Sequence, residues 1–307
     1  MDHRFLVRFW GVRGSFPVPG PHTLKIGGNT PCVEVLVNGH LVILDGGTGI
    51  IALGNDLLRR ARDTGKAIMA VILFSHTHHD HTQGLPYFKP AYIGESVFHI
   101  FGPRLFYQEI AEALNRAMLP PNFPVDLADL KSLKVIRNLA ESEQIWLLPG
   151  REEPVLRNIF RERPPESGDV VRIDVLKSYA HPQEGVFFYK ISYRGRSLVY
   201  ATDTEGYIGG DQRLIRFAQG VDLLIHDAQY SEAEYLDPLS PTQGWGHSTP
   251  QMAMDVARAA RVKQLLLFHH DPGHSDEQLL QLERELQIDM PGVRLAYEGL
   301  EVDLTAL

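Results

Sequence analysis

Short apolar runs alternate with amphipathic stretches along the whole chain. Residues 67–74 (AIMAVILF) are continuously apolar, which predicts a strand that is buried on both faces. Residues 50–62 carry apolar side chains at helical spacing and therefore predict a helix. Strands that alternate with helices in this way indicate an α/β fold.

Further apolar positions along the chain show either strand-like or helical spacing. They predict strands at 5–10, 32–37, 41–44, 186–193, 197–200, 222–225 and 264–268, and helices at 249–261 and 276–285. Asn38 and Gly39 lie between two of these runs and predict a tight hairpin turn. Several of the expected strands end in His or Asp, namely at His76, Asp203, His226 and His269. Because strand ends and their loops carry the sites of α/β proteins, we expect these residues to face a common site.

Residues 99–170 are the least regular part of the chain. They are rich in proline, so we expect an insertion or a cap beside the core of a single domain that spans residues 1–307. Four aromatic residues of this segment could stack on a ligand ring, although core packing is the more frequent role for such residues: Phe101, Phe106, Tyr107 and Phe123.

Composition narrows the functional classes. The chain has 307 residues and a net charge of −8, which argues against a nucleic-acid-binding protein with a broad basic surface. Its single cysteine, Cys32, excludes an internal disulfide and favours a reducing, cytoplasmic location. The longest apolar run is far shorter than the roughly 20 residues needed to cross a bilayer, and the first residues lack the apolar segment of a signal peptide. We therefore expect no membrane association.

Ligand-type side chains follow the strand 67–74 directly. The segment His76-Thr77-His78-His79-Asp80-His81 has the form HxHxDH, and imidazole and carboxylate groups bind zinc, manganese or iron. Four such groups on one turn can face two metal ions, and His181, Asp203 and His269 are candidates for the remaining ligands. Adjacent histidines without a metal would repel each other when protonated, so a purely structural role is disfavoured here. It is favoured for the isolated histidines: His3, His22, His40, His99 and His274.

These motifs resemble those of the metallo-β-lactamase superfamily. The resemblance rests on SHTHHDH at 75–81, Asp45 in LDGGTG, Asp203 in YATDT, His226-Asp227 in LLIHDAQY, GHST at 246–249 and the histidine after LLLF. It implies a four-layer αβ/βα sandwich with the metals at one edge. A GHST segment followed by a helix, a strand and a final histidine is similar to the phosphodiesterase branch, which includes ribonuclease Z and the cyclic-phosphate phosphodiesterases.

The resemblance also implies the metal ligands. His76, His78 and His181 would hold the first ion, whereas Asp80, His81 and His269 would hold the second, and Asp203 would bridge both. Zinc is the first expectation for the two divalent ions, with manganese and iron as alternatives. His270 is an alternative to His269 as a metal ligand. His79 lies within the motif but is expected to flank the metals rather than bind them.

The catalytic roles follow from the same resemblance. A hydroxide that bridges the metals would attack phosphorus, and His247 would donate a proton to the leaving oxygen. Asp80 is expected to serve catalysis as well as metal binding, and Asp227 occupies the place of a glutamate that supports this histidine in ribonuclease Z. Asp45 is expected to orient a ligand imidazole.

The substrate is expected to be small. Ribonuclease Z grips tRNA with a long arm between the positions of His181 and Asp203, but only 21 residues separate them here. We therefore expect a cyclic nucleotide or another cyclic phosphate as the substrate, and no nucleic-acid partner. Three residues in glycine-rich turns could face its phosphate: Arg13, Asn29 and Thr48.

Several alternatives stay open at this point. The chain could be a tRNA 3′-processing endoribonuclease that lacks the usual arm, and a homodimer could then supply the grip. It could instead hydrolyse a thioester or lactone on the same fold, although the GHST segment speaks against this. A regulatory protein that binds metal without catalysing a reaction is a further alternative. It is disfavoured because all seven expected ligand positions carry residues that can bind a metal.

Overall fold

Two β-sheets face each other in the computed structural model, which describes residues 3–104, 108–121, 123–162, 169–207 and 209–306. The first sheet has the strand order β15-β1-β2-β3-β4-β5-β6, and β3 to β6 run parallel. Its strands are β1 (Phe5–Gly11), β2 (Cys32–Val37), β3 (His40–Leu44), β4 (Met69–Leu73), β5 (Val97–Pro103), β6 (Leu133–Leu139) and β15 (Glu301–Asp303).

The second sheet has the order β14-β13-β12-β11-β10-β9-β7-β8, and β11 to β14 run parallel. Its strands are β7 (Glu143–Leu147), β8 (Val155–Asn158), β9 (Val171–Ser178), β10 (Val186–Tyr193), β11 (Arg196–Ala201), β12 (Leu223–Asp227), β13 (Gln264–Phe268) and β14 (Val293–Leu295). The parallel strands of both sheets thus end in connecting loops, and these loops carry the residues that we expect to form a site.

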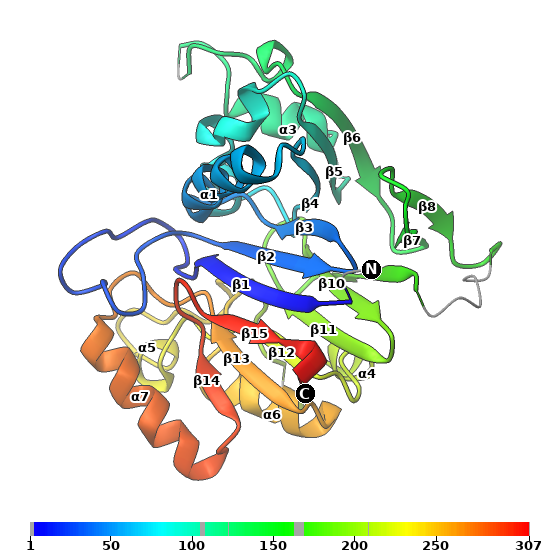
Figure 1. Cartoon of the computed structure of the whole chain (residues 1–307). Helices are drawn as coiled ribbons and strands as arrows, with labels where there is room; N and C mark the ends of the chain where they lie inside the picture. The colour runs from blue at the N-terminus through cyan, green and yellow to red at the C-terminus, as the bar shows by residue number, and fades with distance from the viewer. Residues whose placement is uncertain (1–2, 105–107, 122, 163–168, 208, 307) are drawn as a thin grey trace.

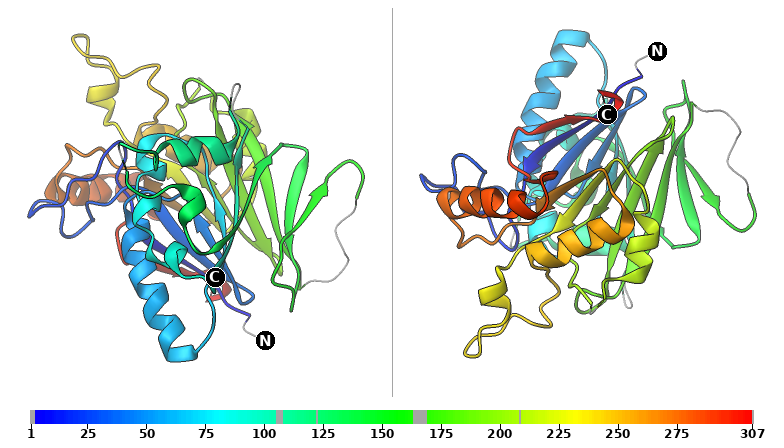
Figure 2. Two further views of the ribbon diagram at one scale, coloured as in Figure 1. Left: turned by 90° about the horizontal axis from the view of Figure 1, so that it is seen from above. Right: turned by 90° about the horizontal axis from the view of Figure 1, so that it is seen from below.

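Helices cover the outer face of each sheet (Figure 1). On the first sheet lie α1 (Gly49–Thr64) and α3 (Ile110–Arg116), and on the second lie α4 (Gln212–Phe217), α6 (Pro250–Ala260) and α7 (Asp276–Asp289). Two short helices, α2 (His79–Thr82) and α5 (Glu232–Tyr235), lie in loops, and the segment around α5 extends away from the sheets (Figure 2). The expected four-layer αβ/βα sandwich is therefore confirmed.

Apolar side chains fill the spaces between the layers. One core joins the facing sides of the two sheets, with Phe5, Val35 and Phe188 wholly buried in it. A second core lies between the first sheet and α1, and Ile50, Leu53 and Ile72 are wholly buried in it. The alternating burial of β1 and the complete burial of β12 show why a period of two and a continuous apolar run both predicted strands here.

We expected an insertion or a cap at residues 99–170, and the structure shows that this segment contributes strands to both sheets. It completes β5 and supplies β6 to the first sheet, and it also supplies β7 and β8 to the edge of the second sheet. Phe101 is buried in the core between the sheets, and Phe123 packs against the core beneath α1. Phe106 and Tyr107 lie outside the described residues. The pairing of β5 with β6 and that of β7 with β9 join segments that are distant in sequence, whereas β7 and β8 form a local antiparallel pair.

The boundaries of most elements agree with their patterns. Asn38 and Gly39 adopt positive φ angles of 50° and 80° in the turn between β2 and β3, as an Asn-Gly hairpin requires. Thr249 caps α6 by accepting a hydrogen bond from Met252 N, and Pro250 occupies its first turn. Among the described residues, no helix combines the length and apolar character needed to span a membrane.

Candidate metal centre

Residues just beyond the strand ends turn back into one buried site. Asp45 follows β3, Asp203 lies two residues after β11, and His269 follows β13. Their φ angles are 61°, 53° and 62°, in the left-handed region that non-glycine residues rarely adopt. This backbone conformation redirects each side chain at the point where its strand stops, and such strain is concentrated at functional sites.

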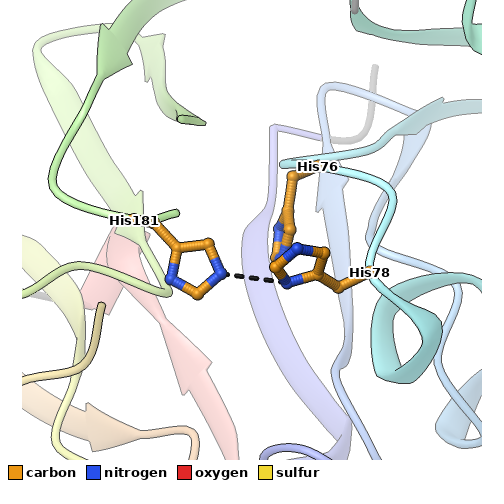
Figure 3. A group of neighbouring side chains, drawn as sticks. All are labelled: His76, His78 and His181. Atoms are coloured by element: carbon orange, nitrogen blue, oxygen red, sulfur yellow. Dashed lines mark hydrogen bonds between the residues drawn. The ribbon is translucent and has the colours of Figure 1, made fainter. Parts of the chain in front are cut away.

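Three histidines form the more exposed half of the site (Figure 3). Nε2 of His181 lies 3.0 Å from Nδ1 of His78, and the ring of His76 is 4.4 Å from that of His78 between centroids. One nitrogen from each of the three rings lies within 4.8 Å of the others. His181 reaches this cluster from the loop after β9, and its Nδ1 lies 2.9 Å from the carbonyl oxygen of Gly246.

Four residues form the inner half of the site. Nε2 of His81 lies 3.2 Å from Nε2 of His269, and Oδ2 of Asp80 lies 3.1 Å from the same atom of His269. Oδ1 of Asp203 is 3.2 Å from His81 Nε2 and 3.3 Å from His269 Nε2. These four side chains are buried, and their donor atoms also lie within 4.8 Å of one another.

Asp203 connects the two halves. Its Oδ1 faces His81 and His269, whereas its Oδ2 lies 3.6 Å from His76 Nε2 and 3.7 Å from His181 Nε2. The seven residues expected as metal ligands are therefore brought together, with the expected bridging residue between two groups of three.

The donor set fits divalent cations. Nε2 of His76 is buried and has no hydrogen-bond partner, so it is an orphaned donor atom that a metal would satisfy. Burial, together with the neighbouring His81, lowers the pKa of His76 well below its ordinary value, which keeps it in the neutral form that binds metals. Four carboxylates are buried here without an ion pair to lysine or arginine among the described residues: Asp45, Asp80, Asp203 and Asp227. A bound cation would offset this negative charge.

Asp45 fixes the orientation of His81, as expected. Its Oδ2 lies 2.8 Å from His81 Nδ1, so Nε2 of that ring faces the site. Ser75 donates two hydrogen bonds to the same carboxylate, from its backbone N–H at 2.7 Å and its hydroxyl at 2.8 Å. The hydroxyl of Tyr200 donates a further one at 2.8 Å. Such contacts hold ligand imidazoles in place.

Some of these partners were not predicted from the sequence. Oε1 of Gln229 lies 2.9 Å from His269 Nδ1, and the backbone N–H of Ser15 donates to Asp80 Oδ2 at 2.8 Å. Gln229 lies two residues after the strand-end pair His226-Asp227, and this position could have identified it as a residue of the site. Tyr200 and Ser15 carried no such signal, because their partners are distant in sequence.

His247 and Asp227 form a buried pair beside the cluster. Nδ1 of His247 lies 2.7 Å from Oδ2 of Asp227, whose other oxygen accepts hydrogen bonds from the backbone N–H groups of Ser248 and Gln229. Burial alone would lower the pKa of His247, but the carboxylates of Asp227, Asp203 and Asp80 together outweigh this effect and raise the pKa to about 9. The ring of His247 also stacks on that of His269, with 4.9 Å between centroids.

Several sequence candidates have other roles. Nε2 of His270 lies 2.9 Å from the carbonyl oxygen of Ala296, so His269 is the residue that reaches the cluster. His226 is buried within β12 with Nδ1 next to the Asp227 carbonyl, and His79 is exposed.

The three turn residues that the sequence offered as possible phosphate contacts instead hydrogen-bond to other loops. Arg13 is wholly buried and donates to the carbonyl oxygens of Gly27, Asp271 and His274. Asn29 donates to the carboxylate of Glu298 at 3.1 Å. Thr48 accepts a hydrogen bond from the backbone N–H of Thr30 at 2.9 Å.

Comparison with known proteins agrees with this geometry. A family model described as "Beta-lactamase superfamily domain" matches residues 40–270, which include the whole ligand cluster. The chain belongs to the β-lactamase superfamily. Within the superfamily, ribonuclease Z of Thermoplasma acidophilum is 27% identical, with 91% of each chain covered. Ribonuclease Z of Thermococcus kodakarensis is 26% identical, with 78% of each chain covered.

Solved structures share the same fold. The metallo-β-lactamase fold protein YhfI from Bacillus subtilis superposes with a TM-score of 0.65 at 17% identity, covering 98% of this chain and 99% of that one. Human tRNase Z, short form, gives 0.59 at 20% identity, covering 97% and 99%. Membership of the superfamily is thus confirmed, and ribonuclease Z sequences and the structure of a tRNase Z are among the proteins that this chain resembles.

Proposed function

We propose that this β-lactamase-superfamily chain hydrolyses a small phosphodiester, a cyclic nucleotide or a related cyclic phosphate, with two divalent metal ions. The observation that carries the proposal is the position of Asp203 between two ligand groups, with the His247–Asp227 pair next to them. In our proposal His76, His78 and His181 hold one ion, and Asp80, His81 and His269 hold the other. Zinc is the first candidate, because imidazole and carboxylate ligands suit it, as they suit manganese and iron.

The bound ions would lower the pKa of a water molecule and offset charge on the phosphoryl oxygens. The protein supplies the proton for the leaving oxygen. Asp227 holds Nδ1 of His247, so Nε2 is the atom from which that proton passes. Asp80 is held by Ser15 N–H and by His269, which fixes its carboxylate at the reacting centre.

The short segment between His181 and Asp203 supports a small substrate. This segment contains only β10, a turn at Arg194-Gly195 and β11, which leaves no room for a long arm that would hold a tRNA. The net charge of −8 also disfavours a polyanion as the substrate. A tRNA 3′-processing activity remains the second candidate, because the curated relatives described above are named ribonuclease Z.

A panel of substrates separates these candidates. The metal-loaded protein is assayed with cyclic AMP, cyclic GMP, ribose 1,2-cyclic phosphate and a precursor tRNA, and with a thioester and a lactone as controls. Our proposal expects turnover of at least one cyclic phosphate and none of the controls. Cleavage of the tRNA alone would overturn the small-substrate proposal in favour of the second candidate.

A further inference from the structure

A cavity of about 470 Å³ is lined in part by His181, whereas Asp80 and His269 of the ligand set are not among its lining residues. Tyr179, His181, Gln183, Glu205 and Tyr207 are among its lining residues. Its volume lies within the range of roughly 300–1,000 Å³ that is typical of small-molecule sites. Because His181 belongs both to the cavity and to the ligand cluster, a group in the cavity is next to the proposed reaction centre.

Two aromatic rings in this cavity are open to solvent. Tyr179 is 65% exposed and Tyr207 is 52% exposed, although the ring faces of both are apolar. Lys177 places its ammonium 5.1 Å from the centroid of the Tyr179 ring. An aromatic ligand that covered these faces would remove apolar surface from water, and stacking on tyrosine requires no particular base sequence.

The charge of the cavity favours an uncharged group. Among its lining residues none is lysine or arginine, and Glu205 contributes a carboxylate. That carboxylate accepts hydrogen bonds from the hydroxyl of Tyr235 and from the backbone N–H groups of Gly244 and Gly246, so it is held in place as part of the wall. Glu205 would repel a phosphoryl group placed beside it, whereas it would not repel a neutral ring; the Lys177 ammonium lies at the Tyr179 ring and is not one of the lining residues. The exposed amide of Gln183 offers both a donor and an acceptor for the edge of such a ring.

We propose that this cavity binds the nucleobase of the substrate against Tyr179 and Tyr207, while the phosphodiester lies at the ligand cluster. This inference rests on the proposed function, which it narrows from cyclic phosphates in general to nucleotides. Tyr179 and Tyr207 are then specificity-determining residues, and base-free ribose cyclic phosphates are the poorer substrates.

Binding of a nucleoside tests the cavity without any turnover. Adenosine has no phosphate, so its affinity for the metal-loaded protein is measured by isothermal titration calorimetry for the wild type and for Tyr207→Ala, Tyr179→Ala and Tyr207→Phe. We expect each alanine variant to weaken adenosine binding about 10-fold and Tyr207→Phe to retain it, because the phenyl ring still stacks. Phe160→Ala is the matched control: Phe160 is 82% exposed but lies outside this cavity, and its loss should leave adenosine binding as it is.

Kinetics provide the second readout. The ratio of kcat/KM for cyclic AMP to that for ribose 1,2-cyclic phosphate should fall about 10-fold in Tyr207→Ala and stay at the wild-type value in Phe160→Ala. Absence of adenosine binding to the wild type, or equal binding by wild type and both alanine variants, would overturn the base site. If the wild type hydrolyses no phosphodiester but adenosine binding is lost in the alanine variants, the proposed function fails and the base site stands.

Discussion

Asp227 holds the imidazole of His247, with 2.7 Å between its Oδ2 and the Nδ1 of the histidine. Both side chains are buried, and the other oxygen of Asp227 is bound by two backbone N–H groups. The position of the histidine therefore depends on a carboxylate that is itself fixed by the main chain.

Asp227→Asn tests this dependence. An amide keeps the size of the side chain but removes the charge that favours a proton on His247, so we expect kcat for bis-p-nitrophenyl phosphate to fall about 100-fold with the metal content retained. Asp227→Glu is the matched variant, because it keeps the charge on a longer side chain and should retain more of the rate. Equal rates for Asp227→Asn and the wild type would remove Asp227 from the mechanism.

Tyr200→Phe tests the support of the metal ligands. The change removes one hydrogen bond to Asp45, which orients His81. We expect a loss of about 1–2 kcal/mol in the free energy of unfolding and a metal affinity that is roughly 10–100-fold weaker. Tyr189→Phe is the control, since its equally buried hydroxyl donates to the carbonyl oxygen of Phe74 rather than to Asp45. It should lower stability by a similar amount while metal affinity stays near the wild-type value. A chelator competition assay measures that affinity, and equal affinities for both variants would contradict the proposed role of Tyr200.

Gly246→Ala should displace His181 and so disturb the ligand group of His76, His78 and His181. A Cβ atom at this position would lie 2.3 Å from Nδ1 of His181, so the histidine must move. We expect loss of about one metal ion per chain and a fall in turnover of at least about 100-fold. Gly244→Ala controls for backbone strain, because its φ of 83° is close to the 87° of Gly246 but its Cβ would meet no atom within 4 Å. Similar metal contents for the two variants, measured by elemental analysis, would show that contact with His181 is unimportant.

Acid should weaken the fold partly through Asp222. Burial alone would raise the pKa of this carboxyl, but Lys263, the backbone N–H of Ser197 and Arg196 bind it and lower the pKa below its ordinary value. Its stabilising contribution is therefore present above the unfolded-state pKa and is lost as the pH falls through the lowered folded-state pKa. We expect Asp222→Asn to cost about 1–3 kcal/mol at pH 7. Urea unfolding of both proteins from pH 7 to pH 3 should show this difference shrinking, and a constant difference would contradict the prediction.

The structure brings the seven expected ligands together, and each of them lies in or just after a strand or motif that the sequence indicated. Asp203 and His269 follow parallel strands of the second sheet, which end at the same edge, whereas His76 follows β4 of the first sheet. The sequence favoured His269 over His270, and the structure places His269 at the cluster, with its backbone in the left-handed region at a φ of 62°.

Interactions between distant segments were harder to predict. The pairing of β7 with β9 and the contact of Tyr200 with Asp45 join residues whose local patterns say nothing about each other. Arg13 illustrates the same limit: its turn indicated a phosphate contact, but three carbonyl oxygens from other loops surround its guanidinium. The exposure of Tyr179 and Tyr207 likewise depends on how the loops around His181 pack.

The most direct test of the proposed metal-dependent phosphodiesterase compares the wild type with His247→Ala in one preparation, measuring metal content by elemental analysis and turnover of bis-p-nitrophenyl phosphate. We predict about two transition-metal ions per chain in both proteins, hydrolysis by the wild type, and a rate lower by about 10²–10⁴-fold in the variant. A wild-type protein that binds no metal, or a variant that keeps the wild-type rate, would contradict the account.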